Sequence, residues 1–118
     1  MTAKKKTAPT APTLLDLAEA YVQSLEKAGK SSGTQFSYMM DLKLALAEMG
    51  EATPISEITP ERVAAFFECE RVTRTRGGLP KSEITIKKTA RVLRFALEYA
   101  VQQGWLESAP LPETPAAE

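Results

Sequence analysis

Apolar residues recur at intervals of three and four positions through the middle of this 118-residue chain, which is the spacing of one face of an α-helix. The pattern predicts four helices, each bounded by a capping residue or a glycine. Their predicted ranges are 14–29, 34–49, 60–71 and 83–104. No stretch alternates with the period of two that a half-buried strand shows, so the chain is predicted to be all-α.

The predicted helix 34–49 has two apolar stripes on nearly opposite sides. One stripe contains Tyr38, Leu42, Ala45, Leu46 and Met49, and the other contains Phe36, Met40, Leu44 and Ala47. Two interpretations follow from the small polar surface of this helix. Either it is the central element of a helical bundle, which is the simpler interpretation, or a partner domain covers one of its stripes.

Both ends of the chain have a different composition from the middle. Residues 1–12 are Lys, Thr, Ala and Pro after the initial Met, and residues 111–118 are rich in proline and acidic. Neither end can bury enough apolar surface to offset the entropy of ordering it. We therefore expect a basic disordered tail, one folded domain over residues 13–110, and a flexible C-terminal linker.

Several classes of protein are disfavoured by what the composition lacks. No apolar run approaches the ~20 residues that cross a bilayer, and no secretory signal is present, so a cytoplasmic protein without a membrane contact is expected. Cys69 is the only cysteine and the chain has no histidine, which excludes an internal disulfide, the common zinc patterns and a Cys/His nucleophile. Beside Phe66 and Phe67, Cys69 is predicted to be a small buried side chain. No metal or cofactor is expected.

Charge is distributed unevenly although the formal net charge is zero. Eight cations and one acid, Glu83, lie between Arg71 and Arg94. Around the last predicted helix, Lys87, Arg91 and Arg94 fall in one narrow sector and Lys88 flanks it. The pattern predicts a cationic ridge free of acids. Such a ridge is often only the solvated face of a helix.

Three features favour a functional interpretation of the ridge. It is unmixed with acids, it continues into an exposed arginine-rich connection, and its helix begins with hydroxyl residues that can meet a phosphate. A helix of this kind can enter a DNA major groove. The alternative is a non-catalytic helical protein-interaction domain, whose ridge binds an acidic partner and whose second apolar stripe binds an apolar one. An enzyme has the least support, because no carboxylate pair, glycine-rich phosphate loop or metal-ligand cluster is present.

Three segments together resemble a known family. They are "TLLDLAEAYVQSLEKAGKSSGTQFSYMMDLKLALAEMG", "ISEITPERVAAFF" and "SEITIKKTARVLRFALEYAVQQGWLESAP". Their order and spacing over residues 13–110 resemble the N-terminal core-binding, SAM-like domain of tyrosine recombinases, the phage integrases. One departure is Ala109, where the family usually has asparagine before the proline.

The resemblance implies an orthogonal bundle of four helices that closes over one side of a recombination site, with the second and fourth helices facing the DNA. In that family a separate C-terminal domain carries the catalytic arginines, histidine and tyrosine. This chain is therefore expected to be a non-catalytic, monomeric module of a protein encoded by a mobile element, with double-stranded DNA and a C-terminal catalytic domain as partners. When bound to DNA it would be associated with the nucleoid.

The resemblance also implies the residues of the DNA-binding face. On the second helix start they are Lys30, Ser31, Ser32, Thr34 and Gln35, and on the fourth helix they are Lys81, Ser82, Thr85, Lys87, Lys88, Arg91 and Arg94. Ser32 and Ser82 have an alternative role as N-caps, and Thr85 as a partly buried residue. Lys87, Lys88 and Arg91 are the favoured DNA contacts.

Overall fold

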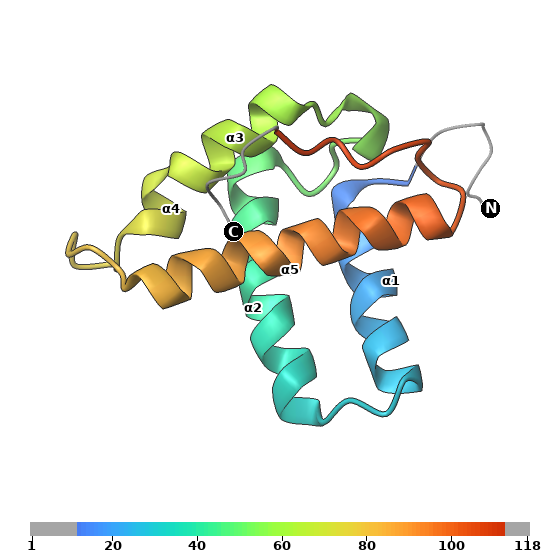
Figure 1. Cartoon of the computed structure of the whole chain (residues 1–118), viewed down its shortest axis with the longest axis horizontal. Coiled ribbons are helices and arrows are strands. Elements are labelled where there is room, and N and C mark those ends of the chain that lie inside the picture. The colour runs from blue at the N-terminus through green and yellow to red at the C-terminus, as the bar shows by residue number, and fades with distance from the viewer. Residues whose placement is uncertain (1–11, 113–118) are drawn as a thin grey trace.

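The computed structural model describes residues 12–112, and its regular elements are helices (Figure 1). The α-helices are α1 (Leu14–Lys27), α2 (Ser32–Met49), α3 (Pro60–Glu68), α4 (Glu70–Thr73) and α5 (Glu83–Gln102), with a short 3-10 turn at Ile55–Glu57. Among the described residues there is no strand, and only two isolated bridges, Thr13 with Pro54 and Arg74 with Pro80, have sheet-like pairing. The prediction of an all-α fold is confirmed.

Side-chain caps define where the helices begin. Thr13 and Asp16 form a reciprocal capping box at α1, with both hydrogen bonds 3.1 Å long. Thr59 and Ser82 cap α3 and α5 as predicted. The cap of α2 is Ser31, whose Oγ accepts a hydrogen bond from the Thr34 backbone N–H. Since Ser31 satisfies that amide, α2 begins at Ser32, two residues before the predicted start, and Ser32 is not an N-cap.

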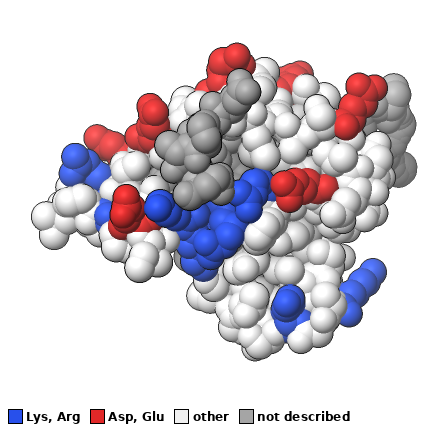
Figure 2. Space-filling view, in the orientation of Figure 1, with Lys and Arg blue, Asp and Glu red and all other residues white. Residues whose placement is uncertain are grey.

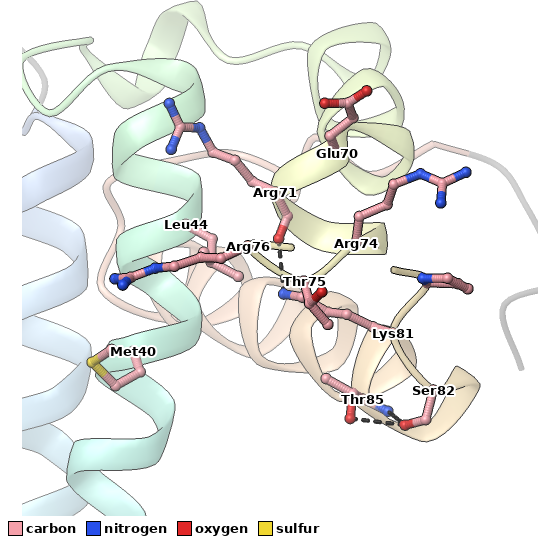
Figure 3. A pocket seen from close by; sticks show the side chains of 11 residues that line it. Met40, Leu44, Glu70, Arg71, Arg74, Thr75, Arg76, Lys81, Ser82 and Thr85 are labelled. Carbon is pink, nitrogen blue, oxygen red and sulfur yellow. Dashed lines mark hydrogen bonds between the residues drawn. The ribbon is translucent and has the colours of Figure 1, made fainter. Parts of the chain in front are cut away.

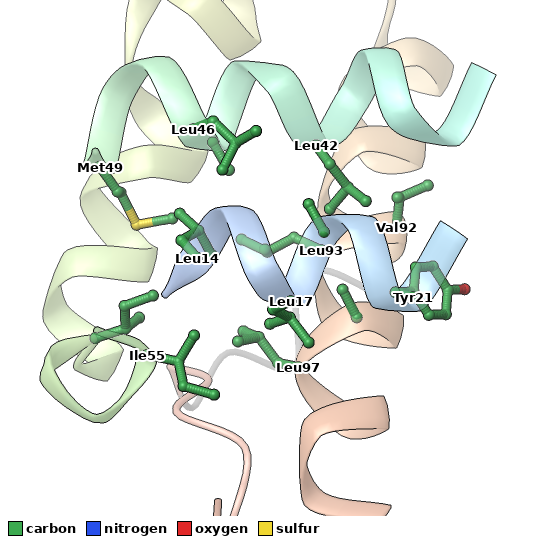
Figure 4. Close-up of a cluster of buried hydrophobic side chains, with 14 of the residues drawn as sticks. Leu14, Leu17, Tyr21, Leu42, Leu46, Met49, Ile55, Val92, Leu93 and Leu97 are labelled. Atoms are coloured by element: carbon green, nitrogen blue, oxygen red, sulfur yellow. The ribbon is translucent and has the colours of Figure 1, made fainter. Parts of the chain in front are cut away.

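The core lies where α1, α2 and α5 meet (Figure 4). Leucines dominate it, with Leu17 from α1, Leu42 from α2, and Leu93 and Leu97 from α5 all buried. Figure 1 shows α5 running across α1 and α2, and α2 contacts every other α-helix. The predicted central position of α2 is therefore confirmed by its contacts.

The second apolar stripe of α2 is nevertheless partly open to solvent. Leu44 packs partly buried against the core, whereas the side chains of Phe36 and Met40 are 68% and 46% exposed. A central position in the bundle therefore does not account for the whole stripe.

The third predicted helix is broken, and the expectation of one helix over 60–71 is wrong. Cys69 is extended, with φ −72° and ψ 163°, and separates α3 from α4. In an unbroken helix, residue 72 would lie about 240° around the axis from residue 66, at ~100° per residue. The break instead lets both Phe66 and Val72 be buried. Cys69 itself is partly rather than fully buried.

The connection between α4 and α5 is exposed, as predicted, but it is internally hydrogen-bonded. The Thr75 N–H donates to the Leu79 carbonyl at 2.7 Å, and the Lys81 N–H donates to the Thr73 carbonyl at 2.8 Å. Gly78 adopts a φ of 89°, a conformation that favours glycine. Residues 74–81, which we call the arginine loop, therefore form a defined turn.

The chain beyond α5 packs back onto the core. Trp105 meets the ring of Tyr99 edge-on, with centroids 6.0 Å apart, and Leu111 is partly buried against the core. Burial raises the pKa of the neighbouring Tyr21 to about 12, with smaller contributions from Tyr38 and Glu98. Packing thus continues one residue past the predicted bound of the domain. The predicted tails lie almost entirely outside the described residues.

Candidate nucleic-acid interface

An open groove of about 850 Å³ separates α2 from the arginine loop and the start of α5 (Figure 3). We call it the arginine groove. Its lining residues come from α2, α4, the arginine loop and the first turn of α5, and they are Met40, Leu44, Glu70, Arg71, Arg74, Thr75, Arg76, Pro80, Lys81, Ser82 and Thr85. Four of them are cations and one is an acid, so the groove has an excess of positive charge.

Two of the four cations of the arginine groove are held in place by backbone carbonyls. The Lys81 Nζ donates to the Arg71 carbonyl at 2.8 Å, and the Arg74 Nη1 donates to the Gly78 carbonyl at 3.1 Å. A carbonyl positions a cation without neutralising it. Arg71 differs, because its Nε pairs with the Glu48 carboxylate at 3.1 Å.

Arg76 differs from Arg71, which also reaches α2, in having no acidic partner there among the described residues. Figure 3 shows its side chain extending from the arginine loop toward α2. Within residues 12–112, no ion pair to Arg76 is present. Its guanidinium therefore adds a positive charge that is not balanced by an acid of the described chain.

The start of α5 forms one end of the groove. The Ser82 Oγ accepts from the Thr85 N–H at 3.1 Å and lies 2.9 Å from the Thr85 Oγ1. Both side chains are exposed, so the expectation that Thr85 points partly into the core is wrong. The first amides of a helix have no partner within it and attract anions. Ser82 thus has the predicted capping role at a position that also faces the groove.

Lys88, one of the favoured DNA contacts, is partly buried and paired with an acid of α2. Its Nζ pairs with the Asp41 carboxylate, whose other oxygen accepts a 2.7 Å hydrogen bond from the buried Thr89 hydroxyl. The Lys88 Nζ also lies 5.4 Å from the centroid of the Tyr38 ring. Asp41, which sequence reasoning missed, therefore links α2 to α5. Its carboxylate also compensates the positive charge of Lys88, which the sequence had assigned to the ridge.

The other ridge cations lie on a different face from the arginine groove. Lys87 borders a small pocket of about 260 Å³ against α3, beside Phe67 and Glu68. Positions 85 and 87 are about 200° apart on a helix, so Thr85 and Lys87 cannot share a flat contact surface. In Figure 2 the cations gather over α5, with acidic side chains on either side.

An acid borders the ridge at its C-terminal end. Glu98 lies one turn beyond Arg94 and pairs with it at 3.9 Å. Helical spacing places Glu98 in the same sector as Lys87 and Arg91. Of the three cations in that sector, Lys87 and Arg91 are exposed and Arg94 is partly buried.

The residues predicted at the start of α2 form a separate group. Lys30, Ser31 and Ser32 are exposed, and Thr34 and Gln35 are partly buried. The Gln35 side-chain amide donates to the Lys30 carbonyl at 3.1 Å. Figure 1 shows the start of α2 and the arginine loop at different corners of the molecule. The structure therefore does not bring this group into the arginine groove.

Replacing Asp41 by alanine is expected to lower the free energy of unfolding by about 1–3 kcal/mol. The half-buried Lys88 loses its carboxylate partner, and the buried Thr89 hydroxyl keeps only its longer hydrogen bond, 3.3 Å, to the Thr85 carbonyl. Urea denaturation measures the change. Glu48→Ala is the matched control, since Glu48 pairs with Arg71 at the surface and such pairs contribute about 0–1 kcal/mol. Equal losses in the two variants would contradict a structural role for Asp41.

These features define an all-α domain with a basic groove beside one helix start. The chain matches the family model described as the phage integrase SAM-like domain over residues 13–116. It therefore belongs to the phage integrase SAM-like domain family. A comparison with curated proteins found no match. A comparison with solved structures also found no match.

Proposed function

We propose that this chain binds double-stranded DNA as the core-binding domain of an integrase of the tyrosine recombinase class. It supports site-specific recombination and does not cut DNA itself. The observation that carries the proposal is the arginine groove, a concave surface in which Arg71, Arg74, Arg76 and Lys81 lie together. Membership of the phage integrase SAM-like family supports the same role.

The chemistry of the groove suits a phosphate backbone. Guanidinium groups bind phosphate oxygens in pairs of hydrogen bonds, and a helix start provides amides for the same oxygens. No acid of the described chain forms an ion pair with Arg74, Arg76 or Lys81, so their positive charges near the start of α5 are not compensated by an adjacent carboxylate. On the outer face of α5, by contrast, Arg94 pairs with Glu98. We therefore assign the larger share of DNA affinity to the groove, with Lys87 and Arg91 as secondary contacts.

The strand-cutting chemistry is assigned to a C-terminal catalytic domain of the parent protein. The chain contains no histidine. Tyr21 is buried and Tyr99 partly buried, while the Tyr38 ring lies beneath Lys88, so none of the three is placed to attack a phosphodiester. Within residues 12–112 no group of three potential metal ligands gathers. No described helix is long and apolar enough to span a bilayer. The proposed location is the cytoplasm, on DNA.

Binding of the isolated domain to a duplex should be weak and strongly dependent on salt. If three or four cations neutralise phosphates, the logarithm of the association constant should fall with the logarithm of the salt concentration at a slope of about −3 to −4. Fluorescence anisotropy with a labelled duplex across a salt series measures this slope. Binding that does not depend on salt would contradict the proposed phosphate contacts.

A second candidate function is a protein-interaction domain. The observation that favours it is the exposure of Phe36 and Met40 on α2, because exposed apolar residues that lie together often mark partner surfaces. An absence of any duplex binding in the salt series would favour this function over the first.

A further inference from the structure

The exposed side of α2 combines apolar and positive residues and lies next to the arginine groove. Phe36 and Met40 are one turn apart, and Met40 also lines the groove. Helical spacing places the exposed Lys43 in the same sector of α2 as these two residues. The acids of α2 are Asp41, which is bound to Lys88 and Thr89, and the exposed Glu48 near the helix end, which pairs with Arg71.

This pattern favours a nucleic acid over an apolar protein partner at the same surface. A cation beside two exposed apolar side chains, with the cations of the groove adjoining, complements a polyanion that carries some apolar groups. In duplex DNA the apolar group that faces the major groove is the thymine methyl. Phenylalanine provides a flat apolar surface, and methionine is flexible enough to fit around a methyl group.

We infer that Phe36 and Met40 are specificity-determining residues that contact thymine methyl groups in the major groove. The inference rests on the proposed function, because the arginine groove must hold the phosphates while α2 lies along the base edges. Phe36 and Met40 are about 6 Å apart along the helix axis, at 1.5 Å per residue. Successive base pairs are about 3.4 Å apart, so the two side chains reach positions about two base pairs apart.

The test begins with selection of bound sequences from a random duplex pool by the wild-type chain. The selected duplex is then prepared with thymidine or with deoxyuridine, which lacks the methyl group. Wild-type binding should weaken about fourfold for each contacted methyl, the effect expected from one buried carbon. The double variant Phe36→Ala, Met40→Ala should bind the two duplexes equally and should keep the wild-type salt slope.

A matched control is Leu79→Ala. Leu79 is 68% exposed, as Phe36 is, but it lies in the arginine loop and does not line the groove. This variant should keep the wild-type preference for thymidine. Circular dichroism spectra confirm that each variant is folded.

The outcomes separate this inference from the proposed function. Equal wild-type binding to the thymidine and deoxyuridine duplexes would overturn the methyl contacts while leaving DNA binding intact. A thymidine preference that survives in the Phe36→Ala, Met40→Ala variant would also overturn them. A wild-type chain that binds no duplex would overturn both proposals and assign the α2 surface to a protein partner.

Discussion

Replacing Arg74, Arg76 and Lys81 together by glutamine is expected to weaken duplex binding at least tenfold at low salt. Each substitution removes a charge that faces the arginine groove, and a tenfold weakening corresponds to about 1.4 kcal/mol over three phosphate contacts. The salt slope should become shallower by about one unit for each cation that no longer neutralises a phosphate. Glutamine keeps much of the length and the polarity of the side chains, so the helical content should not change. Anisotropy titrations at several salt concentrations measure both quantities.

Two matched triple variants show whether position or total charge determines the affinity. In the first, Lys87, Arg91 and Arg94 on the outer face of α5 are replaced by glutamine. In the second, Lys4, Lys5 and Lys6 near the N-terminus are replaced in the same way. Each removes three cations, and each should weaken binding less than the groove variant does. If the outer-face variant loses more duplex affinity than the groove variant, the groove assignment is contradicted. The main DNA contact would then be the ridge on α5, as the sequence indicated.

Leu97→Ala is expected to lower the free energy of unfolding by about 2–5 kcal/mol, the usual cost of truncating a buried leucine to alanine. Leu97 is 0% exposed and lies in the core shared by α1, α2 and α5. A decrease of this size is a large part of the stability of a domain of about 100 residues. Denaturation by urea or heat measures it.

The control for Leu97→Ala is again Leu79→Ala. The residue type and the atoms removed are the same, but Leu79 lies on the surface of the arginine loop. Its effect on the free energy of unfolding should be within about 0.5 kcal/mol of zero. A comparable decrease in the free energy of unfolding at both positions would contradict the assignment of Leu97 to the core and of Leu79 to the surface.

Local signals in the sequence predicted the helices well because their caps act over three or four residues. Thr13, Thr59 and Ser82 each accept a hydrogen bond from an amide three positions later, and this requires no distant partner. The break at Cys69 could not be predicted in this way. It depends on the packing of Val72 into a core formed by distant segments, and the periodicity of residues 60–71 did not show it.

The candidate site was predictable in composition but not in arrangement. The excess of cations between residues 71 and 94 is visible in the sequence, and it does form a basic surface. Its division into two faces depends on the path of the chain after α4, which turns Arg76 toward α2, whereas Arg74 bonds back to the Gly78 carbonyl of its own loop. The partner of Lys88 lies 47 residues earlier in the chain, so the helical spacing of α5 could not reveal it.

The link between Asp41, Lys88 and Thr89 has a consequence for how this domain can vary through evolution. A change at position 41 would leave the Lys88 charge without its carboxylate and the Thr89 hydroxyl with only its longer hydrogen bond to the Thr85 carbonyl, so it should be retained mainly when positions 88 and 89 also change. Amino-acid substitutions at these three positions should therefore occur together, although Asp41 lies on a different helix from the other two. Among relatives that keep the same helix crossing, the three positions should be inherited as a unit, whereas the exposed residues around them diverge freely.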